Sequence, residues 1–228
     1  LYYAGGDTST GISADVRWNP LGVGDLSSVL VTAVPAAPLA ERTYALAALG
    51  ADRVANAGST SRMLTVDFTA PTVTLSAGGR ALTQGAAQLV AGAAPQLAAA
   101  FSDVTSGIDQ VSIALLLDGA DVTSLAQVAV NGNDALATYT PTTLAPGLHT
   151  LEARAADRAG NATTLTAQFL LDPVPPAGAL SSPTPGALFG AGPIALHADF
   201  ADSLSGLATG TLTLTVDGST LPATISFD

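Results

Sequence analysis

The sequence predicts an all-β protein made of tandem β-sandwich domains, and internal repetition is the first observation that predicts it. Residues 144–172, LAPGLHTLEARAADRAGNATTLTAQFLLD, return to a pattern already present at residues 39–67. Residues 101–119 reappear in the same way at residues 200–218. A period of roughly 100 residues is too long for a solenoid repeat and is the size of one small β-sandwich.

The second observation is an alternation of apolar and polar residues with a period of two, which is typical of half-buried strands. It runs through Val111–Leu117, His149–Ala155 and Leu165–Leu171. Turn sequences separate such stretches, among them Asp118-Gly119 and Asn131-Gly132-Asn133-Asp134. About seven strands in ~100 residues, with turns every ~8–12 residues, predict an immunoglobulin-like sandwich for the complete repeat.

The complete repeat is predicted to open with a strand at Thr72–Ser76. Gln88–Phe101 is predicted to hold a second strand, although its alanine-rich stretch would also suit a helix on propensity alone. Strands at Gln127–Val130 and Ala135–Thr140 flank the Asn-Gly hairpin. The last two strands of the repeat are joined by a turn at Arg158-Ala159-Gly160-Asn161.

Proline clusters mark the predicted domain boundaries, because proline cannot continue a strand ladder and stiffens a connection. They follow Asp67 and Asp172. The predicted domains are a partial repeat with closing strands (1–69), a complete repeat (70–173) and a partial repeat with opening strands (174–228). We expect these domains to form an elongated array with short connections.

Strands are also predicted in both partial repeats. In the first, Val16 and Trp18 alternate with Arg17. In the third, Leu212, Leu214 and Val216 occupy the inward positions that Ile113, Leu115 and Leu117 take in the complete repeat.

Charge and composition exclude several classes of function. The net charge is −11 and all seven basic residues are arginine, so the basic surface that nucleic-acid binding needs is missing. The chain has no cysteine, which excludes disulfides and Cys-ligated metals. No apolar run reaches the ~20 residues of a membrane helix, and no signal peptide is visible.

Three motifs make the chain resemble the immunoglobulin-like repeats of large bacterial surface adhesins and biofilm-associated proteins. They are the Asp-x-Thr-Ala-Pro linker at 67–71, the Leu-x-Pro-Gly-x-His strand entry at 144–149, and the Asp-x-Ala-Gly-Asn turn at 157–161. The first repeat departs from two of them, with Glu41-Arg42 and Ala55 at the corresponding positions. The resemblance implies a sandwich fold and a spacer function on the bacterial surface.

Two histidines and a tyrosine are candidate functional residues with a structural alternative. Tyr44 and His149 share one repeat position, at the entry to the penultimate strand. A corner role is favoured for both, in which the polar tip of the side chain bonds to nearby backbone. His197 has no partner that would indicate a triad or a zinc site, so a structural role is favoured for it too.

The aspartates are the candidate metal ligands. They lie in turns and at the linkers: Asp52, Asp67, Asp103, Asp157, Asp172 and Asp202. Carboxylates gathered at domain junctions could bind Ca²⁺, which takes six to eight oxygen ligands. The favoured alternative is that aspartate and asparagine bond their own backbone in the turns, as Asn56 and Asn161 would.

No catalytic residues, cofactor-binding residues or metal ligands are assigned. No nucleophile elbow, phosphate loop or HExxH motif occurs, and Glu41 and Glu152 lie in separate repeats, which argues against a glycosidase pair. The Asn161-Ala162-Thr163 sequon is a short match that arises by chance. Trp18, with Tyr2 and Tyr3, could stack on a sugar, but a core position is favoured for it.

We therefore expect a non-catalytic structural segment of a bacterial extracellular or cell-surface protein. Its expected partners are neighbouring repeats and other copies of itself, without nucleic acid and without membrane insertion. The segment would be an adhesin stalk, or a filament subunit in which one copy completes the end repeat of the next. The alternative is a carbohydrate-binding or spacer module of a secreted polysaccharide-degrading enzyme.

Overall fold

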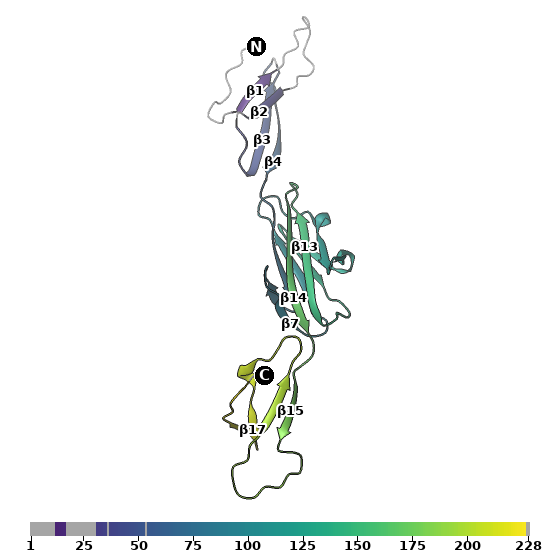
Figure 1. Ribbon diagram of the computed structural model, residues 1–228. Helices are drawn as coiled ribbons and strands as arrows, with labels where there is room; N and C mark the ends of the chain where they lie inside the picture. The colour runs from purple at the N-terminus through teal and green to yellow at the C-terminus, as the bar shows by residue number, and fades with distance from the viewer. Residues whose placement is uncertain (1–11, 17–30, 36, 53, 227–228) are drawn as a thin grey trace. The chain divides into compact units, whose positions relative to one another are not determined.

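The protein is described by a computed structural model, which covers residues 12–16, 31–35, 37–52 and 54–226. These residues form strands joined by turns, which confirms the predicted all-β class (Figure 1). The chain divides into two compact units, Leu1–Thr69 and Ala70–Asp228, and this division falls within the first predicted linker. The boundary expected after Pro173 stays a prediction.

The second unit contains a sandwich of two five-stranded sheets. The first sheet has the order β10-β9-β13-β14-β7, formed by Ala120–Asp121, Ala114–Leu117, Gly147–Ala156, Ala162–Asp172 and Gln88–Ala91. The second has the order β11-β12-β8-β5-β6, formed by Gln127–Asn131, Asp134–Tyr139, Leu97–Ser102, Thr72–Ala77 and Arg80–Leu82. Neighbouring strands are antiparallel except β14 and β7, which run parallel.

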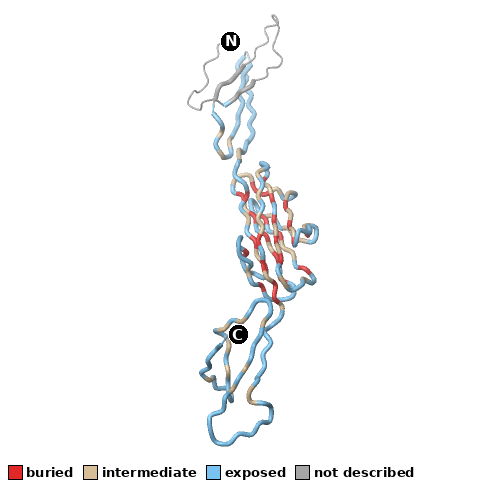
Figure 2. The backbone as a smooth tube through the Cα atoms, in the orientation of Figure 1, coloured by how far each residue is buried: buried red, intermediate tan, exposed pale blue. Residues whose placement is uncertain are grey.

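The core lies between these two sheets and follows the predicted alternation. On β13 the inward side chains include Leu151 and Ala153, and on β14 they include Phe169 and Leu171; all four are fully buried. Leu75 on β5, with Phe101 on β8, is among the residues that close the core from the opposite sheet. Among residues 37–52 and 54–226, whose burial the structure describes, the buried ones lie from Pro71 to Asp172, as the red segments of Figure 2 show.

Two predicted strands of the complete repeat differ in the structure. Gln88–Phe101 is neither one strand nor a helix, but two strands in different sheets, separated by Gly92 with φ 92° and by Pro95. Val111 is not an inward strand residue. It lies in the 3₁₀ turn η2 (Gln110–Ser112) and is 90% exposed, because the Asp109 side chain caps this turn by accepting the Val111 N–H.

The first unit contains two antiparallel pairs. They are β1 (Ile12–Val16) with β2 (Val31–Pro35), and β3 (Arg42–Ala51) with β4 (Ala57–Val66). The predicted strand around Val16 is present, whereas Trp18, Tyr2 and Tyr3 lie outside the described residues.

Beyond the sandwich, the second unit contains two more antiparallel pairs. They are β15 (Ala177–Ser182) with β16 (His197–Ala201), and β17 (Leu214–Val216) with β18 (Ser219–Leu221). Leu212 precedes β17, directly after the 3₁₀ turn η4 (Thr209–Thr211), just as Ile113 follows η2. The third such turn in the described ranges is η3 (Thr123–Leu125).

Candidate functional site

The predicted corner bonds are present in both repeats. The Tyr44 hydroxyl donates to the Ala40 carbonyl at 2.9 Å. At the equivalent position, the Nε2 of His149 lies 2.7 Å from the carbonyl of Ala145. Each ring therefore ties the entry of a long strand to the backbone four residues earlier, which confirms the structural role predicted for Tyr44 and His149.

His149 has a second partner that the sequence did not indicate. Its Nδ1 lies 2.7 Å from Oδ2 of Asp118, whose Oδ1 accepts the Thr150 N–H at 2.8 Å. The Ala145 carbonyl and the Asp118 carboxylate thus hold the imidazole ring from both of its nitrogens and fix its orientation. The Phe169 ring lies beside it, with centroids 5.4 Å apart. The bonds of Asp118 to His149 and Thr150 tie the β9–β10 turn to β13.

The Asp-Asn turns of the two repeats are built alike. Oδ1 of Asp157 accepts the Ala159 and Asn161 N–H groups at 2.8 and 2.9 Å, and its Oδ2 accepts the Asn161 side-chain amide at 2.7 Å. Asp52 makes the equivalent bonds with Val54 and Asn56. These bonds confirm the favoured interpretation, in which aspartate and asparagine bond their own turn. The bonds from Asn56, with that from Val54, lower the pKa of Asp52.

We expect Ala55→Gly to stabilise the first unit. Ala55 has φ 69°, a left-handed conformation that costs an L-residue about 1–2 kcal/mol, whereas the equivalent residue in the second repeat is Gly160 with φ 96°. The gain should be about 0.5–1 kcal/mol, because glycine also loses more chain entropy on folding. Urea unfolding measures it, and Gly160→Ala should show the opposite sign. A destabilising Ala55→Gly would contradict this account.

The Asp-x-x-Ser-Gly turns also use their carboxylates for local bonds. Oδ1 of Asp103 accepts the Thr105, Ser106 and Gly107 N–H groups, at 3.1, 2.8 and 2.7 Å. In the third repeat Oδ1 of Asp202 accepts the N–H groups of the equivalent Leu204 and Gly206. The turn requires glycine at its last position, where φ is 77° and 74° in the two repeats.

Asp172 joins the complete repeat to the turn of the third repeat. It ends β14 and is 8% exposed. Its Oδ1 accepts the Val174 N–H at 3.0 Å, and its Oδ2 accepts the Ser205 N–H at 2.9 Å. The bond from Ser205 is the main cause that lowers the pKa of Asp172, and burial opposes it.

Acid is expected to weaken this connection. The pKa of Asp172 is lower in the folded than in the unfolded chain, so its contribution to stability is present above the unfolded pKa of about 3.9 and is lost as the pH falls through the folded value. Hydrogen exchange should show the Ser205 amide protected at neutral pH and less protected at acid pH. Asp172→Asn should remove that dependence on pH. If the protection of the Ser205 amide fell equally with acid in the wild type and in Asp172→Asn, this prediction would be wrong.

Among the described residues of the second unit, Asp103 and Asp157 are the carboxylates best placed to share a cation. They are 4% and 2% exposed, and one carboxylate oxygen of Asp103 lies within 4.8 Å of one carboxylate oxygen of Asp157. Arg158 is the nearby cationic side chain, and its Nη1 lies 3.4 Å from the Ser106 carbonyl. Two carboxylates supply only part of the six to eight oxygens that Ca²⁺ takes, so backbone oxygens and water would have to supply the others.

The calcium hypothesis predicts a measurable stabilisation. Ca²⁺ at about 1 mM, the range of extracellular modules, should raise the melting temperature above that in chelator, because an ion that binds only the folded state stabilises it. Asp103→Asn should abolish the difference. Identical transitions with and without Ca²⁺ would remove calcium from the account.

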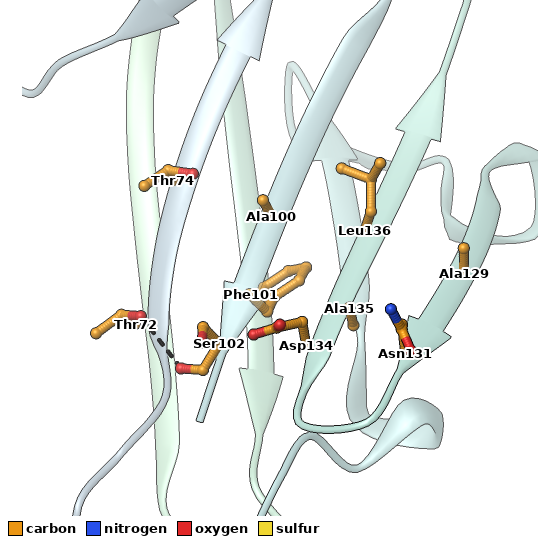
Figure 3. A pocket seen from close by; sticks show the side chains of 10 residues that line it. All are labelled: Thr72, Thr74, Ala100, Phe101, Ser102, Ala129, Asn131, Asp134, Ala135 and Leu136. Carbon is orange, nitrogen blue, oxygen red and sulfur yellow. Dashed lines mark hydrogen bonds between the residues drawn. The ribbon is translucent and has the colours of Figure 1, made fainter. Parts of the chain in front are cut away.

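A shallow pocket of about 400 Å³ lies on the outer face of the β11-β12-β8-β5 sheet. Figure 3 shows small side chains around it, such as Thr74, Ala100 and Ala129. Asp134 is the charged residue of the lining, and the ring of Phe101 belongs to the buried core. The pocket therefore offers neither an aromatic surface for a sugar nor a second titratable group for acid–base chemistry.

The remaining candidates have local partners or are exposed. Glu41 accepts the Thr69 hydroxyl at 2.7 Å, and Glu152 pairs with Arg154 on the same strand. His197 begins β16 and is exposed. The Asn161 amide of the sequon is bonded to Asp157.

No protein-family model and no curated protein matches the chain. Among solved structures, the chain is similar to dimeric latent PorU from Porphyromonas gingivalis, with 18% sequence identity and a TM-score of 0.37. The similarity covers 49% of this chain and 11% of that chain. It carries no argument about function. No helix in the described part of the chain has the length and hydropathy to cross a membrane.

Proposed function

We propose that the chain is a non-catalytic structural segment of a bacterial extracellular or cell-surface protein, a stalk or filament subunit made of repeated sandwich modules. One observation carries the proposal: polar side chains 105 positions apart make the same bonds to their own turns and corners. Asp52 and Asp157 bind the same turn atoms, and Tyr44 and His149 bind the same carbonyl position. The module is the repeated unit of this chain.

The burial and the hydrogen bonds of the titratable groups support a non-catalytic function. Asp157 and Asp103 are buried and bonded to backbone N–H groups, so their carboxylates are unsuited to acid–base work on a substrate. His149 is held between two acceptors. These groups stabilise turns and strand entries, as a structural module under tension requires.

The surface chemistry supports the expected location and partners. With a net charge of −11, no lysine and only 11% charged residues, the chain has no basic surface for nucleic acid. It has no cysteine, so its fold does not depend on the redox state of its surroundings. Neighbouring repeats and further copies of the chain are the proposed partners.

Single-molecule stretching tests the structural function. The complete repeat should unfold as one event, with a gain in contour length of roughly 300–350 Å for about 100 residues at 3.3–3.6 Å each, less the folded length. Protease treatment of intact bacteria that make the protein should release its fragments. A gradual extension without a discrete event, or full protection on intact cells, would contradict the proposal.

Affinity electrophoresis in gels that contain polysaccharides tests the carbohydrate-binding alternative. The proposal predicts unchanged mobility in every gel. A retarded band that Trp18→Ala restores to normal mobility would support the sugar-binding function and overturn the proposal.

A further inference from the structure

The strand β11 is the longest edge strand of the sandwich in the complete repeat. It ends the order β11-β12-β8-β5-β6, and among the described strands β12 is the one that pairs with it. In an antiparallel pair only every second residue turns its N–H and C=O toward the partner strand, so the other residues of β11 direct theirs away from the sheet. These groups can bind the backbone of a further strand.

β11 lacks the features that commonly protect an edge strand, which are short length, a charged side chain, proline and a bulge. It has five residues, none of which is charged or proline, and its register with β12 is unbroken. By contrast, the edge strands β6 and β10 have three and two residues and carry Arg80 and Asp121. An uncharged edge also limits the repulsion between two copies of a chain whose net charge is −11.

The sequence of β11 reads alike in both directions. Gln127 and Asn131 place an amide at each end, a valine follows inward from each end, and Ala129 is the centre. The two valines are half-buried and pack against the core, whereas Ala129 and the amides are exposed. Figure 3 shows Ala129 and Asn131 on β11, at the outer face of the sheet. The edge strand β7, which reads Gln-Leu-Val-Ala, has no such symmetry.

We propose that β11 of one chain pairs antiparallel with β11 of a second copy, about a two-fold axis at Ala129. This register places Val128 opposite Val130 of the second copy, and Gln127 opposite Asn131 of the second copy. Because the axis exchanges positions 127 and 131, and positions 128 and 130, residues that direct their backbone groups outward face residues that do the same. The backbone of each strand therefore completes the hydrogen bonding of the other.

The side-chain pairs of this register are chemically matched. A side-chain amide is both a donor and an acceptor, so Gln127 of one copy and Asn131 of the other can bind each other. The two valines lie on the inner face, where cross-strand pairing covers side chains that a single chain leaves half-buried. The same surface is used by both copies, so the contact is isologous and closes as a dimer.

The contact is small, so it should be weak between two free chains. Five paired residues fall well below the ~800 Å² per partner of a standard interface. The two modules run in opposite directions at the contact, as copies presented by two facing surfaces do. Many copies on each surface would add their contacts together. The inference rests on the proposed structural function and specifies its partner as a second copy of the chain.

Disulfide trapping of the 228-residue chain tests the register, because the natural sequence has no cysteine. Residue 129 faces its own copy across the axis, at a Cα separation of about 4.5–5.5 Å that a disulfide can span. Ala129→Cys should therefore form a covalent dimer under oxidised glutathione. Gln127→Cys is the matched control, since it is exposed on the same strand but lies about 13 Å along the strand from its own copy. Ala129→Cys should give about tenfold more dimer on a non-reducing gel than Gln127→Cys.

A mixture of Gln127→Cys and Asn131→Cys should form the covalent heterodimer, because the register places these two positions opposite each other. If Ala129→Cys gave no more dimer than Gln127→Cys, or the mixture gave none beyond its components alone, the inference would be overturned. Circular dichroism shows that each variant is folded.

Charge reversal tests the axis without oxidation. Ala129→Lys and Ala129→Asp should each be monomeric in sedimentation velocity, because each places like charges opposite one another. Their mixture places opposite charges together and should associate more than either variant alone. A mixture that stays as monomeric as its components would overturn the inference. Failure here leaves the stretching and surface-protease results intact, so it is distinguishable from failure of the proposed function.

Discussion

Phe169→Ala is expected to lower the unfolding free energy of the complete repeat by about 3–5 kcal/mol, the usual cost of removing a buried phenylalanine. The side chain is 0% exposed and lies on β14 between the two sheets. Its ring is also beside His149, so the substitution leaves a cavity next to a side chain with two hydrogen bonds. Urea denaturation monitored by circular dichroism measures the change.

Leu64→Ala is the matched control, because Leu64 occupies the same repeat position on β4. It is 39% exposed, so truncation removes little buried surface and should cost about 1 kcal/mol or less. Equal losses at the two positions would show that the first repeat has its own closed core, contrary to the exposure of its inward residues.

The strands with strict alternation were predictable from the sequence. On β13 and β14 the inward side chains are large or tightly packed, such as Leu151 and Phe169, and the period of two assigns them to one face without knowledge of the partner sheet. The Asp-Asn turn was predictable for a similar reason, since all its bonds lie within five residues. Local chemistry determined these elements.

The alternation of apolar and polar residues gave a wrong strand prediction at Val111, where the backbone forms a 3₁₀ turn capped by Asp109. Val111 fits the period-two alternation of the following strand. However, the Asp109 carboxylate accepts its N–H, and the Ser112 hydroxyl donates to the Asp109 and Ala156 carbonyls. The signal was present as aspartate followed three residues later by serine, a pattern of capped turns. Alternation describes side chains and does not report that the backbone has left the strand.

The pair formed by Asp118 and His149 could not be found from the sequence. Thirty-one positions separate the two residues, and they meet only because β9 pairs with β13. The sequence therefore predicts only a turn position for Asp118, which its φ of 52° confirms. Likewise, Thr123 bonds Leu115 across the β9–β10 hairpin. Such contacts depend on the register between strands, which no local pattern contains.

Asp157→Ala should be the most damaging change outside the apolar core, with a loss of about 2–4 kcal/mol. The substitution leaves the Ala159 and Asn161 N–H groups and the Asn161 side-chain amide without their acceptor, at a position that is 2% exposed. The same turn also holds the Asp103–Gly107 turn, because the backbone N–H of Arg158 donates to the Gly107 carbonyl at 3.0 Å. Urea denaturation and the amide exchange of Gly107 should both report the loss.

Two variants separate the effect of burial from the effect of bond number. Asp157→Asn can keep the backbone bonds through its carbonyl oxygen but places a donor toward the Asn161 amide, so an intermediate loss is expected. Asp52→Ala removes the same set of bonds in the first repeat, where the turn is exposed and water can replace the lost acceptor, so its loss should be smaller than that of Asp157→Ala. If Asp52→Ala proved as costly as Asp157→Ala, the number of bonds and not their burial would determine the stability of these turns.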